Sequence, residues 1–142
     1  MAGTGKDAPV TLRAPHAIGS RIKENLAAAQ RARRSGDAMS CWRLLEDAHV
    51  LSQPWPLPHV GAHWAMFTAA VALREWNETP GQVVRLVAAG PASVLNRYPR
   101  GNTGRSAVPA TQPMPIRPDL AALLKTALHD EERRPQRNKR DR

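Results

Sequence analysis

Three prolines fall within residues 54–58 and interrupt a stretch that is otherwise patterned as helix. Glu46 and His49 precede them at a spacing of i, i+3, while His59 and His63 follow them at i, i+4. On an α-helix, each of these spacings places both side chains on one face. Because proline ends a helix and also suits the first turn of the next, the stretch predicts two helices joined by a short turn.

The two pairs form a candidate metal site if the helices fold back on each other. Glu46 would supply one carboxylate, and His49, His59 and His63 would supply three imidazoles, which is enough for one tetrahedral ion. Such ligands suit zinc, iron, nickel or copper. The alternative is that the histidines are core residues bonded to backbone carbonyls or to Glu46. Neither interpretation identifies a reaction, so enzymatic activity is left undecided.

Apolar residues recur at helical spacing along most of the chain. We expect helices over residues 17–34, 38–52, 58–76 and 80–96, with Pro91 kinking or splitting the last, and a short helix over 119–129. The predicted fold is all-α: a compact bundle of four main helices plus a short C-terminal helix. The predicted division is a disordered leader at 1–16, one helical domain at 17–129 and a charged, disordered tail at 130–142.

The first two predicted helices are joined by a tight turn, in which Gly36 suits a helix end and Asp37 caps the following helix. This αα-hairpin is similar to a tetratricopeptide-type unit. Only one copy is visible, whereas a solenoid needs about three, so the similarity implies a packing geometry rather than a repeat array.

A long Pro/Gly-rich loop follows, over residues 98–117. Its glycines free the backbone to turn, and N–H groups beside Arg100 would then cradle a phosphate or carboxylate. The candidate anion-binding residues are Arg100, Gly101, Asn102, Thr103 and Gly104. The alternative is a structural turn in which Arg100 pairs with Glu46 or Asp47.

The formal net charge of +9 permits contact with an anionic partner, and the alternative is that the charges lie on solvated helix faces and serve solubility. A non-enzymatic protein-interaction module, or an electrostatic nucleic-acid binder using this basic surface, is therefore the alternative to metal binding. Cys41 is the only cysteine, which excludes a thiolate metal cluster. It falls on a predicted buried helix face, where a free thiol behaves as a small apolar group. No apolar run approaches the roughly 18 residues of a membrane span, and we expect a cytoplasmic protein without a membrane partner.

Four motifs in the same order resemble a small bacterial family. They are Leu45-Glu46-Asp47-Ala48-His49-Val50-Leu51, His59-x-x-x-His63-Trp64-x-Met66, Arg100-Gly101-Asn102-Thr103-Gly104 and Pro113-Met114-Pro115-Ile116. This is the uncharacterised domain-of-unknown-function family three-seven-zero-three, and the resemblance covers roughly residues 22–128. It implies a compact helical protein and supplies no reaction.

Overall fold

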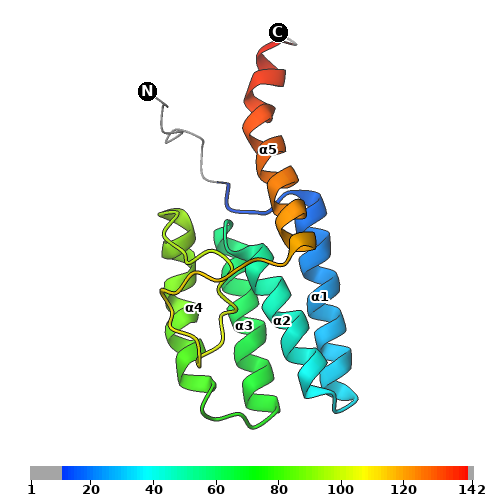
Figure 1. Ribbon diagram of the computed structural model, residues 1–142, viewed down its shortest axis with the longest axis vertical. Helices are drawn as coiled ribbons and strands as arrows, with labels where there is room; N and C mark the ends of the chain where they lie inside the picture. The colour runs from blue at the N-terminus through cyan, green and yellow to red at the C-terminus, as the bar shows by residue number, and fades with distance from the viewer. Residues whose placement is uncertain (1–10, 141–142) are drawn as a thin grey trace.

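The computed structural model describes residues 11–140, and within them the chain forms five helices and no strand. These are α1 (His16–Arg34), α2 (Ala38–Ser52), α3 (Pro56–Ala72), α4 (Thr79–Val94) and α5 (Pro118–Arg140). Helices α1 to α4 run alongside one another in chain order, and α5 projects from one end (Figure 1). The predicted all-α bundle is confirmed.

The hairpin of α1 and α2 forms as predicted. Gly36 adopts a φ of +81°, a left-handed conformation that glycine accepts without steric cost. The backbone N–H of Ser40 donates to the Asp37 carboxylate at 2.9 Å, so Asp37 caps α2. The bounds of α2 match the prediction.

Helices α3 and α4 each differ from the prediction in one respect. Helix α3 ends at Ala72 rather than near residue 76, because Arg74 turns into the left-handed region at φ 59° and the Glu75 N–H returns to the Ala70 carbonyl. Helix α4 continues through Pro91 instead of splitting there. Pro91 lacks only its own N–H, so one backbone bond is lost, and the helix ends three residues later at Val94.

Helix α5 is longer than predicted and runs to Arg140, through most of the segment assigned as a disordered tail. Glu131 anchors the extension by accepting hydrogen bonds from Trp55 Nε1 at 3.3 Å and Thr11 Oγ1 at 3.1 Å. Glutamate and arginine also favour helix, so charge alone did not indicate disorder. Residues 1–10 of the leader and 141–142 of the tail lie outside the described residues, and the three-part division of the chain stays a prediction.

Two apolar clusters hold the helices together. One joins α1, α2 and α5 around Ile18, Leu51 and Trp55, and the other joins α1, α2 and α3 around Leu45 and Met66. Helix α4 contributes differently, because its buried residues are Gln82, Ala89 and Ser93. The layer between α2, α3 and α4 is therefore polar.

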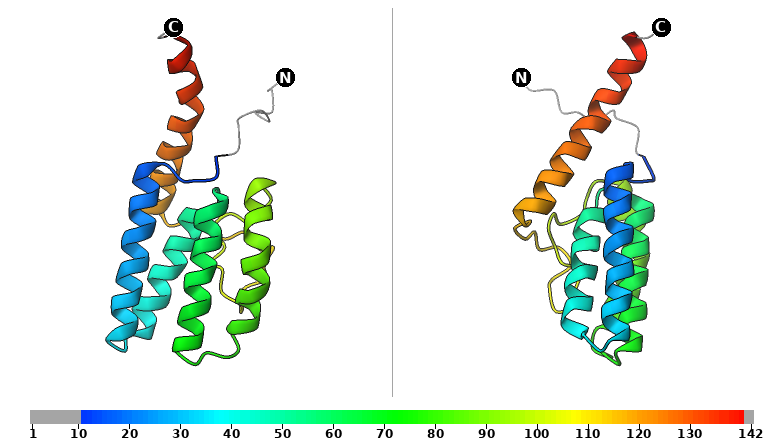
Figure 2. Two further views of the ribbon diagram at one scale, coloured as in Figure 1. Left: turned by 180° about the vertical axis from the view of Figure 1, so that it is seen from behind. Right: turned by 90° about the vertical axis from the view of Figure 1, so that its right-hand side faces the viewer.

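The segment 95–117 crosses one face of the bundle before reaching α5 (Figures 1 and 2). In the side view it lies on the same side of the bundle as α2 (Figure 2). We call this segment the covering loop. Among the described residues, no helix is both long and apolar enough to cross a membrane.

Candidate metal centre

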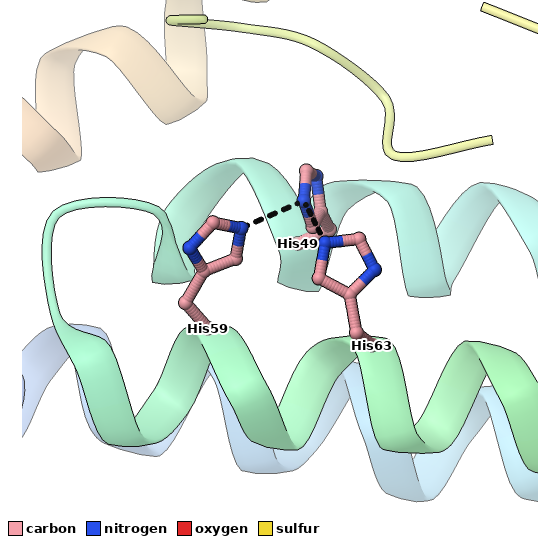
Figure 3. A group of neighbouring side chains, drawn as sticks. All are labelled: His49, His59 and His63. Carbon is pink, nitrogen blue, oxygen red and sulfur yellow. Dashed lines mark hydrogen bonds between the residues drawn. The ribbon is translucent and has the colours of Figure 1, made fainter. Parts of the chain in front are cut away.

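Three histidine rings meet between α2 and α3. His49 extends from α2 toward His59 and His63, which lie one turn apart on α3 (Figure 3). The His49 Nε2 atom is 3.1 Å from the Nε2 of His59 and 3.1 Å from the Nε2 of His63. The three side chains are 2–4% exposed. We call these residues the histidine trio.

The opposite ring nitrogen of each histidine meets an oxygen atom. His49 Nδ1 lies 2.9 Å from the backbone carbonyl of Asn102, in the covering loop. His59 Nδ1 lies 2.8 Å from the Ser93 hydroxyl, and His63 Nδ1 lies 2.9 Å from Gln82 Oε1, both on α4. Two helices supply the rings, and the next helix and loop fix their orientation.

These partners determine which nitrogen of each ring carries its proton. The Asn102 carbonyl only accepts, so His49 must donate from Nδ1. The Ser93 hydroxyl gives its proton to the Gln53 carbonyl at 2.6 Å and is thus the acceptor for His59. Since all these oxygens accept, the protons lie on the Nδ1 atoms and the Nε2 lone pairs face one another.

The amide of Gln82 is oriented in the same way. Its Nε2 donates to Glu78 Oε1 and to the Gly104 carbonyl, each at 2.8 Å. Both partners are acceptors, so the amide oxygen must face His63. The proton assignment of His63 therefore rests on two further hydrogen bonds.

Burial keeps the trio uncharged. It lowers the pKa of His59 to about 3 and that of His63 to about 4, and in both cases loss of hydration is the main cause. The pKa of His49 is also well below its ordinary value, because the ring is buried and faces two other histidines. Neutral imidazole is the form that binds metal ions.

The covering loop closes over His49 because residue 104 is glycine. A Cβ atom at this position would lie 2.9 Å from the His49 ring. Gln82 and Arg85 both donate to the Gly104 carbonyl, which ties the loop to α4. The loop thus reaches the trio through backbone atoms.

A family model described as a protein of unknown function (DUF3703) matches residues 16–124. The chain belongs to this family. No curated protein and no solved structure matches it. The matched residues include the histidine trio and the oxygen atoms around it, whereas the family's description states no activity.

The fourth predicted ligand lies outside the trio. Glu46 does not join the trio, because its carboxylate pairs with Arg105 at 3.6 Å. Arg105 also contacts Glu75 and Glu78 at 3.3 Å each, and its guanidinium lies 3.8 Å from the centre of the Trp42 ring. The structure brings the three imidazoles together and places the Glu46 carboxylate outside the group, and metal binding by these residues stays a prediction.

In the predicted anion-binding loop, residues 100–104, the backbone N–H groups of Gly101, Asn102 and Gly104 donate to acceptors within the protein. The Gly101 N–H donates to Gln53 Oε1 at 3.0 Å, and the Gly104 N–H donates to the Asn102 side chain at 2.9 Å. The Arg105 N–H, next in the chain, is directed at Thr103 Oγ1. The segment also contacts His49 through the Asn102 carbonyl, and anion binding by residues 100–104 stays a prediction. Arg100 is exposed, and the ion pairs predicted for it belong to other arginines: Arg105 pairs with Glu46, and Arg117 with Asp47.

Sequence reasoning missed Gln82 and Ser93. They are eleven positions apart on α4, which is three turns, and both therefore lie on one face. Helical periodicity gave no signal for them, because a polar stripe opposite a valine-rich face ordinarily indicates the solvent-exposed side of a helix.

Proposed function

We propose that this chain binds a single transition-metal ion through the Nε2 atoms of His49, His59 and His63. One observation carries the proposal: three lone pairs converge in a buried space, and the proton of each ring is held on its other side. Without an ion, the three lone pairs repel one another. A cation at the point where they meet would be coordinated by all three.

The spacing of the trio supports the same conclusion. Zinc–nitrogen bonds of about 2.0–2.1 Å in tetrahedral geometry put ligand nitrogens roughly 3.3 Å apart. Two of the Nε2 separations are 3.1 Å, and all three atoms lie within 4.8 Å of one another. Little movement is needed to surround an ion.

The shell around the trio matches what metal-binding histidines require. Such ligands donate their second ring N–H to a carbonyl, carboxylate or water, which fixes ring orientation. Here the acceptors are a backbone carbonyl, a hydroxyl and an amide oxygen. A purely structural core would be more stable with apolar side chains in these positions.

Burial favours holding an ion over turning over a substrate. In the described part of the chain, no carboxylate or thiol joins the trio, so a general base beside the ion is missing from that group. The proposed role is therefore storage, sensing or delivery of a metal.

The test is a metal titration of tag-free protein. The wild-type chain should retain one ion per chain after gel filtration, measured by elemental analysis, and should unfold at higher temperature with metal than without. Replacing His49 and His63 together by alanine should abolish retention. His16→Ala is the matched control, because His16 is exposed on α1 far along the chain from the trio. Retention by the double variant, or none by wild type, would refute the proposal.

The interaction-module alternative has one observation in its favour. Helix α4 exposes Val84 and Val87, and Leu95 directly after its end is exposed as well; the three are 63–76% accessible. An apolar helix face of this kind fits a protein partner. If the titration finds no bound metal, this alternative becomes the working hypothesis.

A further inference from the structure

The charge of the trio's surroundings limits which ion it can hold. All three ligands are neutral, and the groups that accept their Nδ1 protons are neutral as well. Among the described residues no carboxylate or thiolate completes the set. The complex would therefore carry the full charge of the ion.

Nearby charged groups do not compensate for that charge. Arg85 donates to the Gly104 and Val108 carbonyls beside the trio, and its positive charge helps to lower the pKa of His49 and of His63. Glu78 is linked to His63 only through Gln82, and its carboxylate is already paired with Arg105. The site is thus electropositive before any ion enters.

A buried charge costs free energy in proportion to its square, so a divalent ion costs about four times as much as a monovalent one. Zinc also takes four ligands, and here the fourth would have to be water or hydroxide in a space whose side chains are almost fully buried. Copper in its +1 state carries half the charge and is satisfied by three ligands.

We propose that the histidine trio is a copper(I) site, three-coordinate through Nε2 of His49, His59 and His63. This inference rests on the proposed function and names its ion. Imidazole is a suitable copper ligand, and no electron transfer is invoked. The ion enters and leaves as copper(I).

The test compares two ions on the same tag-free protein. Copper(I) is titrated without oxygen in competition with bicinchoninate, and zinc is titrated in competition with a chromophoric chelator. Copper(I) should bind at one per chain and at least about a hundredfold more tightly than zinc. X-ray absorption should show copper(I) with three nitrogen neighbours. His63→Ala should lose copper(I) binding, and His16→Ala should keep it.

Tighter binding of zinc at the same histidines would overturn the copper(I) assignment and leave the proposed metal-binding function intact. Binding of neither ion would overturn the copper(I) assignment, and the proposed metal-binding function fails as well if iron and nickel are not retained either.

A second variant tests the charge argument directly. Exchanging two side chains, as Glu78→Gln with Gln82→Glu, leaves net charge and composition unchanged and moves one carboxylate next to His63 Nδ1. The ratio of zinc to copper(I) affinity should rise by about tenfold or more. An unchanged ratio in a variant with wild-type helical signal would contradict the argument. If the exchange unfolds the chain, the wild-type comparison decides.

Discussion

Gly104 shows how one missing side chain shapes the site. Its φ is +81°, and the position where a Cβ would stand is 2.9 Å from the His49 ring. Gly36 has the same φ, yet a Cβ there would meet nothing within 4 Å. The two glycines therefore separate the cost of backbone conformation from the cost of contact with the trio.

Gly36→Ala should lower the free energy of unfolding by about 1–3 kcal/mol, which is the strain of a left-handed non-glycine residue. Gly104→Ala should lower it by about 1–3 kcal/mol more, because its methyl group displaces His49, and it should also weaken metal binding. Urea unfolding and metal titration of both variants check this. Equal effects of the two substitutions would show that the loop does not press on His49.

Helical spacing indicated that the trio could meet, since a short turn places α2 and α3 side by side, but it did not fix the rotation of either helix. It could not fix Glu46. That residue is three positions before His49, about 60° away around the helix, and its direction depends on Arg105, far along the chain. Side chains from distant segments decide such details, and helical periodicity does not contain them.

Helix α4 buries its polar face and exposes its apolar face, the opposite of an ordinary surface helix. Gln82 and Ser93 are 0% and 4% exposed, while Val84 and Val87 are 69% and 76% exposed. The apolar pattern predicted the helix correctly but would place its valines inside. The polar face is buried instead because the histidines of α3 need oxygen acceptors there.

The covering loop is clamped by Arg105, which joins it to α2 through Glu46 and to the start of α4 through Glu78. Arg105→Ala should lower the free energy of unfolding by about 1–3 kcal/mol, since Glu78 is 6% exposed and would lose its charge partner. It should also speed metal release, measured by transfer to a chelator.

Arg117→Ala is the control for the clamp. Arg117 is half exposed and pairs with Asp119 and Asp47 at the surface, so its loss should change the free energy of unfolding by less than about 1 kcal/mol. Metal release as slow from Arg105→Ala as from Arg117→Ala would argue against a role for the clamp.

The stability of the whole molecule should depend on pH through the trio. The folded-state pKa values of about 3 for His59 and about 4 for His63 lie below the ordinary 6.5. As pH falls below 6.5, the unfolded chain binds protons that the metal-free folded chain does not, so the free energy of unfolding must fall.

Urea unfolding of metal-free protein between pH 7 and 5 measures this fall. Each of these histidines contributes up to about 1.4 kcal/mol per pH unit, so His63→Ala should have a shallower dependence by up to that amount. The same slope in His63→Ala and wild type would show that folding does not shift the pKa of His63 in this pH range.

Most helices could be predicted from the sequence, because apolar periodicity and turn residues determine local structure. Asp37 and Gly36 specify the α1–α2 hairpin within a few residues of themselves. Helix α5 exceeded its predicted end because Glu131 is held by Trp55 and Thr11, which no local pattern reveals. Contacts between distant segments account for that error as they do for Glu46.

The covering loop follows the histidine trio in the chain, so the parts of the site are synthesised in a fixed order. His49, His59 and His63 are all synthesised before Gln82, Ser93 and the loop that encloses them. At about 5–20 residues per second, roughly two to eight seconds separate the appearance of His63 from that of Gly104 at the ribosome. During that interval the nascent chain presents its imidazoles to the surrounding solution without a lid. If the trio binds a metal as proposed, an ion captured in that interval would be enclosed when the covering loop folds over it.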